Sequence, residues 1–174
     1  YAINKRKTTY EGQSLVSGFN CSTYTAYLEM MTTKQQYRKT DKQQFFQFVQ
    51  SFPEDANLTP REVHQIGLEF AARQFPDYEV LIATHCDTDN LHNHLLVNSV
   101  SFKTGKKLHQ NHDDLVQHRR VNDEICMAHG QPVLESYYKV QKKKRALAGE
   151  YRAAERGESW KFTLIKAIED ALLY

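Results

Sequence analysis

Residues 80–102, VLIATHCDTDNLHNHLLVNSVSF, are the stretch around which the rest of the sequence is arranged. The runs VLIATH and LHNHLLVNSV are apolar or alternating and rich in branched side chains, which predicts two β-strands. The connector CDTDNL holds two aspartates and one asparagine, and these residues favour turns. The stretch therefore predicts a hairpin of two strands.

Three of the eight histidines of the chain fall in this hairpin. His92 and His94 are two residues apart, so in a strand their imidazoles point to the same face. The turn brings His85 back towards that pair. Three imidazoles on one sheet surface make an open metal site, with positions left for water or substrate. The alternative is a polar patch without an ion, in which His85 merely ends a strand.

This pattern resembles the third motif of conjugative relaxases of the MOBP type, a family of HUH DNA-nicking enzymes. The residues that match the motif are His85, Asp87, His92, His94 and Asn98. The resemblance covers the chain from its start to about residue 135. It implies nicking of one DNA strand at the transfer origin of a plasmid or integrative element, giving a 5′-phosphotyrosine and a free 3′-hydroxyl. It also implies one divalent ion, Mg²⁺ or Mn²⁺, on the three histidines.

The resemblance places the attacking tyrosine at Tyr1, because the family's tyrosine is followed within about ten residues by a Lys-Thr pair, here Lys7-Thr8. Tyr10 is the competing candidate. Since the chain opens on tyrosine, we expect a fragment or processed chain that lacks the family's first strand. Replication initiators and transposases of the HUH group instead carry Tyr-x-x-x-Lys after the histidines. Tyr138 with Lys142 fits that alternative.

Further site residues follow from the same resemblance. Asp87 is expected to orient a histidine or to help take a proton. Ser51 matches a motif serine that touches DNA near the cut, and the alternative is an ordinary serine at a strand end. Asn98 is expected on the histidine face of its strand, in contact with DNA. Independently of the resemblance, the charges of Lys106 and Lys107 predict contacts with DNA phosphates, and the alternative for them is a solvated loop.

The whole pattern predicts an α+β fold: an antiparallel sheet of about five strands with helices packed on one face, plus C-terminal helices. Periodicity and end signals predict helices over residues 22–39, 59–75, 113–129, 138–156 and 159–173. The second of these begins with Thr59, Pro60 and Glu62, the signature of a capping box. Residues 43–52, QQFFQFVQSF, predict a central strand with a buried aromatic face.

The same periodicity predicts which side chains are buried and which are exposed. A stripe of packing contacts is expected from Tyr24, Tyr27, Leu28 and Met31. The core face of the helix over 113–129 is expected to hold Leu115, Val116, Val121, Ile125 and Met127. His64 is expected on the surface.

Composition excludes several classes of protein. With 174 residues, 40% hydrophobic and 25% charged, the chain has an ordinary globular composition and room for a core. No apolar run approaches membrane-spanning length. The three cysteines, Cys21, Cys86 and Cys126, show no metal-binding spacing, which favours a reducing compartment and, with the resemblance, the bacterial cytoplasm.

The charge is unevenly distributed. The formal net charge is only +2, but residues 139–166 hold nine Lys or Arg and three Glu. We therefore divide the chain into a relaxase domain, residues 1–136, and a basic helical extension, residues 137–174. In that extension, the residues expected to bind DNA are Lys142, Lys143, Lys144 and Arg145.

The expected partners are single-stranded or locally melted DNA, an accessory relaxosome protein and a coupling protein. Two further interpretations of the histidine cluster stay open: a DNA-binding module with a structural metal, and a metal-dependent hydrolase that uses an activated water. Structural sites are usually closed, which argues against the first.

Overall fold

The structure is a computed structural model that describes residues 3–133. These residues belong to a compact unit that ends at Val133. Predictions that concern Tyr1, Tyr138, the basic segment 142–145 and the helices after residue 137 lie outside the described residues.

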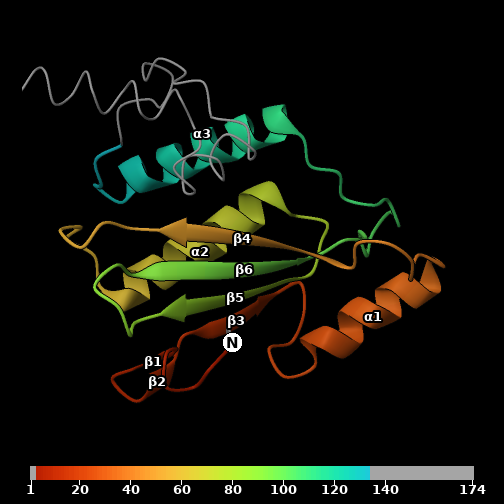
Figure 1. Cartoon of the computed structure of the whole chain (residues 1–174), viewed down its shortest axis with the longest axis horizontal. Coiled ribbons are helices and arrows are strands. Elements are labelled where there is room, and N and C mark those ends of the chain that lie inside the picture. The colour runs from red at the N-terminus through yellow and green to blue at the C-terminus, as the bar shows by residue number, and fades with distance from the viewer. Residues whose placement is uncertain (1–2, 134–174) are drawn as a thin grey trace, which may run out of the picture. The chain divides into compact units, whose positions relative to one another are not determined.

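Four antiparallel strands form the central sheet, in the order β3-β5-β6-β4 (Figure 1). Their bounds are β3 Val16–Phe19, β4 Phe45–Ser51, β5 Val80–His85 and β6 His92–Asn98. A two-stranded hairpin, β1 Thr9–Tyr10 with β2 Gln13–Ser14, precedes them. The α+β class and the antiparallel sheet predicted from the sequence are confirmed.

Strand β4 is an edge strand, so its predicted central position is wrong. Its pairing partner is β6, and the other neighbour of β6 is β5. The predicted burial of one aromatic face is confirmed, because Phe46 and Phe48 pack against the core, whereas Val49 on the other face is 58% exposed.

The strand register separates two faces of the sheet. His85 is paired with His92, and Ala83 with His94, so these side chains share one face. We call it the histidine face. The residues between them, such as Thr84 and Asn93, point to the opposite face.

Two helices cover that opposite face, as Figure 1 shows for α2 Pro60–Gln74 and α3 His112–Ala128. Both begin with a capping box, in which Thr59 or Asn111 accepts from the first turn while an acidic side chain accepts from the cap's own backbone N–H. The core between helices and sheet is formed by buried side chains that include Ile66, Phe70, Phe75, Ile82, Leu95, Val97 and Ile125. No helix among residues 3–133 is both long and apolar enough to cross a lipid bilayer.

Two predictions about helix α3 are wrong. Leu115 and Met127 are exposed, whereas His118 is buried and packs against Phe48 and Phe75. The core-facing stripe therefore runs through His118, Val121 and Ile125, at spacings of three and four residues.

Helix α1, Ala26–Gln36, is shorter than predicted and lies over the end of the histidine face that is remote from the histidines. It is seated there by Met30, whose carbonyl accepts from Asn98, and by Lys34, whose ammonium lies 3.6 Å from the centre of the Phe45 ring. The packing stripe predicted for this helix is largely wrong, because Tyr24, Tyr27 and Leu28 are exposed.

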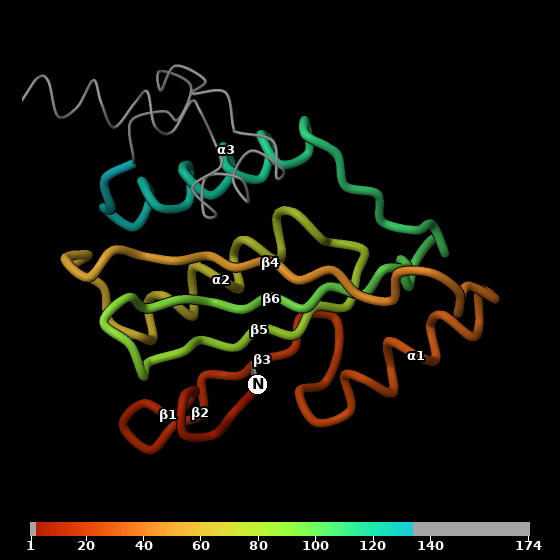
Figure 2. Tube along the Cα trace, viewed as in Figure 1, coloured from red at the N-terminus to blue at the C-terminus, as the bar shows by residue number. Residues whose placement is uncertain are grey.

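The start of the described chain lies against the end of β5. The amide of Thr84 donates to the carbonyl of Leu15, and the amide of Cys86 donates to the carbonyl of Lys7. The trace in Figure 2 shows the β1–β2 hairpin at this end of the sheet. The first residues of the chain thus lead directly to the strand end that carries His85.

Candidate metal centre

His85, His92 and His94 form one cluster on the histidine face, as predicted. Their ring centroids are 4.4 to 5.1 Å apart, and one nitrogen from each lies within 4.8 Å of the other two. Nitrogens that bind one ion at about 2.0–2.3 Å lie at most roughly 4.6 Å apart. Small side-chain rotations therefore suffice for all three imidazoles to hold one ion.

Hydrogen bonds fix the orientation of two of these rings. His92 donates from Nδ1 to the carbonyl of Asn90 at 2.9 Å, which leaves Nε2 as its ligand atom. Nε2 of Gln47 lies 3.0 Å from Nδ1 of His94. The oxygen and nitrogen of a side-chain amide are nearly indistinguishable, and the flipped amide, with its oxygen at Nδ1, puts the proton on Nδ1 and leaves Nε2 of His94 as the ligand atom.

The imidazole of His94 is held in the neutral form that binds metals. Burial lowers the pKa of His94, and the neighbouring His85 and His92 lower it further. Imidazoles bind a metal ion in their neutral form, so three such ligands leave the full charge of a divalent ion available to an anionic substrate. The donor set therefore fits a divalent ion with open coordination positions.

A chain of buried hydrogen bonds crosses the sheet directly behind the cluster. His64 on α2 lies 2.8 Å from the hydroxyl of Ser17 and 2.7 Å from that of Thr84. Thr84 in turn donates to Oδ1 of Asn93 at 2.6 Å. Since the proton of Thr84 is used there, Nδ1 of His64 donates to Thr84. Burial lowers the pKa of His64 and so favours its neutral form, in which Nε2 accepts from Ser17.

The same chain continues to the edge strand and to α3. Asn93 donates at 2.7 Å to both the side-chain oxygen of Gln50 and the carbonyl of Val63, and Gln50 donates at 2.6 Å to Asn122. Every donor meets an acceptor along this path, so the buried polar groups stabilise one register. Thr84 precedes His85, and Asn93 lies between His92 and His94. The strand register that this network stabilises therefore also fixes the positions of the three imidazoles.

Gly67 makes room for this network. A Cβ atom at Gly67 would lie 2.6 Å from Nδ2 of Asn93 and 2.9 Å from its Cγ. Helix α2 can therefore approach the sheet closely enough for the Val63 carbonyl to accept from Asn93 only because residue 67 has no side chain.

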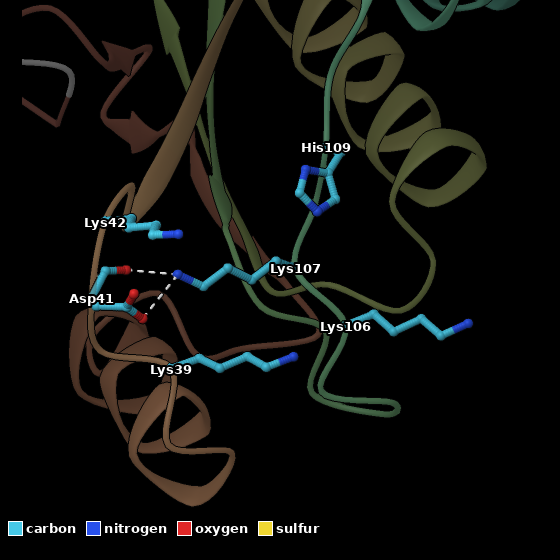
Figure 3. A pocket seen from close by; sticks show the side chains of 6 residues that line it. All are labelled: Lys39, Asp41, Lys42, Lys106, Lys107 and His109. Atoms are coloured by element: carbon cyan, nitrogen blue, oxygen red, sulfur yellow. Dashed lines mark hydrogen bonds and ion pairs between the residues drawn. The ribbon is translucent and has the colours of Figure 1, made fainter.

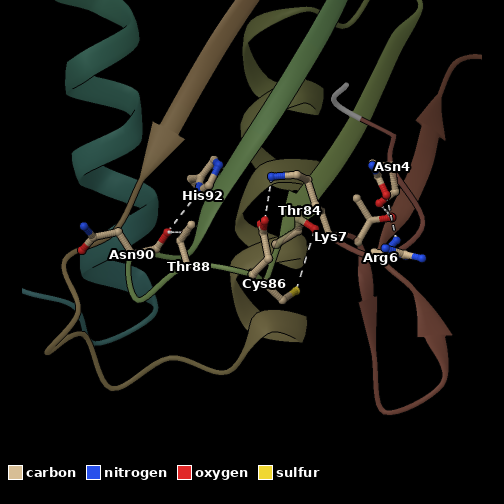
Figure 4. Close-up of polar contacts among 10 residues, drawn as sticks. Asn4, Arg6, Lys7, Thr84, Cys86, Thr88, Asn90 and His92 are labelled. Carbon is tan, nitrogen blue, oxygen red and sulfur yellow. Dashed lines mark hydrogen bonds and ion pairs between the residues drawn. The ribbon is translucent and has the colours of Figure 1, made fainter.

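Asp87 forms an ion pair with Lys7, at 2.6 Å between its carboxylate and the ammonium. The hydrogen bond from Lys7 holds the pKa of Asp87 below its usual range, so the carboxylate is charged at neutral pH. Lys7 also accepts a backbone hydrogen bond from Cys86, next to His85 (Figure 4). The ion pair therefore ties the start of the chain to the metal centre, while the predicted role of Asp87 in orienting a histidine or taking a proton stays a prediction.

Ser51 and Asn98 both lie on the histidine face, with different surroundings. Ser51 is exposed at the end of β4 and is paired with His92. Asn98 is fully buried, and its amide donates to the Glu79 carboxylate at 2.8 Å and to the Met30 carbonyl. The structure therefore gives Asn98 a role in seating α1, in place of the DNA contact predicted from the sequence.

Tyr10 contacts a residue of helix α2. Its ring lies 5.9 Å from the guanidinium of Arg61, and Arg61 pairs with the adjacent Glu11. Arg61 belongs to α2, which covers the face opposite the histidines. This contact argues against Tyr10 as the nucleophile.

An open cluster of three imidazoles at the end of an antiparallel α+β sheet could hold one metal ion. The family model of MobA/VirD2-like relaxases, nuclease domain, matches residues 1–131. The chain therefore belongs to the relaxase family.

Curated relatives agree with this assignment. Two proteins named Protein rlx from Staphylococcus aureus are 35% and 36% identical over 156 residues, which is 89% of this chain and 46% and 49% of theirs. A protein named group II intron-interrupted relaxase LtrB, from Lactococcus lactis subsp. cremoris, is 46% identical over 63 residues, or 34% of this chain and 11% of its own. The chain spans about half the length of the rlx relatives. No solved structure matches it.

The hydrogen-bonded residues behind the cluster were not predicted from the sequence. His64 was expected on the surface but is buried, which corrects that prediction. A signal was present, because His64, Gly67 and Ala71 recur at helical spacing on the core side of α2. Gln47 showed no such signal, since its hydrogen bond with His94 depends on the pairing of two strands that are distant in sequence.

Proposed function

We propose that this chain nicks one strand of DNA at the transfer origin of a plasmid or integrative element, by attack of Tyr1 on the scissile phosphate. The observation that carries the proposal is the cluster of His85, His92 and His94, which lies at the sheet end to which Lys7 ties the start of the chain. At most about 3.6 Å per residue separates Tyr1 from Lys7, so Tyr1 is within roughly 20 Å of that anchor and can reach the cluster.

The proposed reaction is a phosphoryl transfer. The phenol oxygen of Tyr1 loses its proton and forms a bond to phosphorus, while the bond from phosphorus to the 3′-oxygen breaks and that oxygen takes up a proton. The products are a 5′-phosphotyrosine and a 3′-hydroxyl, and the covalent link conserves the phosphodiester for later rejoining. The same step run backwards seals the strand.

His85, His92 and His94 would hold one divalent ion, Mg²⁺ or Mn²⁺. When bound, the ion would neutralise charge on a non-bridging phosphate oxygen. Mn²⁺ suits both imidazole and phosphate better than Mg²⁺ does, since Mg²⁺ prefers oxygen ligands. The protein itself contributes oriented imidazoles, through Asn90 and Gln47, and a charged Asp87 close to the start of the chain.

DNA binding is proposed at Ser51, beside the cut, and at Lys106 and Lys107. In the extension it is proposed at residues 142–145, KKKR, which contribute affinity and not cleavage. Replacing these four cations by glutamine should flatten the dependence of log K on log salt by about 0.7 for each single-strand phosphate that is no longer neutralised. An unchanged slope would assign the segment to solvation or to a protein partner.

The wider setting is proposed from the family. Relaxases process DNA inside the bacterial cell, together with an accessory relaxosome protein and a coupling protein. We extend this setting to the present chain as part of the proposal.

The test is nicking of oligonucleotides from the chain's own mobile element in the presence of Mn²⁺, with His92→Ala and His94→Ala compared with His112→Ala. His112 is exposed at the start of α3, which packs against the opposite face of the sheet, so its replacement is the matched control. We expect the two cluster variants to lose nicking and Mn²⁺ binding, and the control to keep both.

Circular dichroism and urea unfolding show whether each variant is folded. Folded cluster variants that still nick at the control's rate would contradict the proposal. Nicking that persists in excess EDTA would contradict it as well.

A further inference from the structure

A basic hollow lies at the end of the sheet that is remote from the histidines. Its volume is about 480 Å³, and it is lined by Lys39, Asp41, Lys42, Lys106, Lys107 and His109. We call it the lysine pocket. Figure 3 shows that the first three residues come from the segment between α1 and β4, and the others from the segment after β6.

The two segments are fastened to each other by several hydrogen bonds and an ion pair. Lys107 donates to the backbone oxygen of Asp41 at 2.6 Å and pairs with its carboxylate at 3.3 Å. Lys39 donates to the carbonyl of Gly105 at 2.6 Å, and the hydroxyl of Tyr37 donates to the carbonyl of Phe102. The pocket is therefore built from defined loops, and its walls do not depend on a ligand.

The backbone at the rim is strained. Arg38 and Lys42 adopt left-handed conformations, with φ of 52° and 59°, which cost energy for residues other than glycine. Gly105, with φ of 66°, has the Tyr37 ring packed against it so closely that a Cβ would lie 2.3 Å from the ring. Figure 3 shows the side chain of Lys42 in the hollow, beside the end of Lys107.

The pocket concentrates positive charge on a nearly balanced domain. Residues 3–133 hold 14 Lys and Arg against 15 Asp and Glu, yet four of these lysines line the pocket against one aspartate. Asp41 already forms an ion pair with Lys107. The hydrogen bond from Lys107 holds the pKa of the Asp41 carboxyl below its usual range. Lys42 and Lys106 are exposed and have no ion-pair partner among the described residues. These two ammonium groups are thus left for phosphates. Figure 3 shows Lys42 pointing towards the segment after β6 and Lys106 pointing away from the segment before β4, so each would meet a different phosphate.

The distance between the lysine pocket and the metal centre follows from the length of chain that joins them. Lys107 is bridged to Val100, which lies six residues beyond His94 along β6 and the bend that follows it, so the distance is at most about 20 Å. DNA backbone rises about 3.4 Å per nucleotide along one stacked strand. About six nucleotides therefore span the distance, and fewer where the strand is stretched.

We propose that the lysine pocket binds the sugar-phosphate backbone of the nicked strand about six nucleotides from the scissile phosphate. This inference rests on the proposed function and adds to it a defined second anchor. Lysine ammoniums bind phosphate as point charges without reading bases, so this anchor contributes affinity and positioning but no sequence preference. It would keep the strand aligned along the sheet while the cut ends are separated.

The test compares the double variant Lys42→Gln/Lys106→Gln with Lys103→Gln/Arg120→Gln. The control removes two exposed cations from outside the pocket, which are paired with Asp77 and Glu124. Affinity is measured by fluorescence anisotropy on nick-site oligonucleotides whose 5′ or 3′ flank is lengthened stepwise. A second measurement takes the salt dependence of binding to oligothymidylate in EDTA, where no nicking occurs.

For the wild type and the control, we expect affinity to rise once one flank passes about six nucleotides. For the pocket variant, we expect no such rise and a salt slope lower by about 1.4, the value for two single-strand phosphates that are no longer neutralised. A rise that persists in the pocket variant, or no rise in the wild type, would overturn the inference. Absence of nicking in every protein would instead remove the proposed function, and the salt slopes in EDTA would still decide whether the pocket binds DNA.

Discussion

The hydrogen-bonded chain behind the histidines predicts a large cost for a nearly isosteric substitution, Thr84→Val. Thr84 is fully buried, and its hydroxyl joins His64 at 2.7 Å to Asn93 at 2.6 Å. Valine keeps the shape and β-branching but leaves Nδ1 of His64 and Oδ1 of Asn93 without a partner. Each unsatisfied buried group costs about 1–3 kcal/mol, so for two groups we expect a loss of about 2–6 kcal/mol in the free energy of unfolding.

The assay is urea unfolding in EDTA, so that bound metal does not add to the stability. For an m-value of about 2 kcal/mol/M, the midpoint should fall by roughly 1–3 M. Thr32→Val is the matched control, because Thr32 is exposed on α1 and its hydroxyl donates only to the Leu28 carbonyl. Its effect should stay within about 0.5 kcal/mol. Equal midpoints for the two variants would show that the polar chain does not stabilise the fold.

The remaining predictions concern the same end of the molecule. Because burial lowers the pKa of His64 below its ordinary value near 6.5, the unfolded state binds the proton first, so stability should fall as the pH drops below about 6.5. His64→Gln should flatten that dependence in urea titrations at stepped pH. Gly67→Ala should cost about 1–3 kcal/mol in the same assay despite the higher helix propensity of alanine, because its Cβ meets Asn93. Asp87→Asn should lower the single-turnover nicking rate by about 10²-fold or more if Asp87 takes a proton. A smaller loss, matched by Lys7→Gln, would assign Asp87 to anchoring the chain start.

The sequence predicted the histidine cluster because the information is local. The His-x-His spacing within one strand and a short turn suffice to place His85, His92 and His94 on one face. The capping box at Thr59 was equally local, and the structure has it as predicted. The antiparallel α+β fold follows from such patterns together with the resemblance.

The support of the site could not be predicted, because it depends on contacts between distant residues. Gln50, Asn93 and Asn122 look like ordinary polar residues in the sequence and become one network only when β4, β6 and α3 meet. Likewise, the burial of Asn98 follows from the position of α1, and the edge position of β4 follows from strand order. Periodicity indicates which face is buried but does not indicate which element covers it.

The central claim is a metal-dependent covalent attack by Tyr1, and mass spectrometry of the DNA–protein adduct tests it most directly. Tyr1→Phe and Tyr138→Phe are each compared with the unchanged chain in Mn²⁺ and in EDTA. We predict a 5′-phosphotyrosine on the peptide that contains Tyr1, formed in Mn²⁺ only and absent from Tyr1→Phe. An adduct on Tyr138 would assign the chain to the mechanism of replication initiators, and cleaved DNA that carries a plain 5′-phosphate would show attack by water.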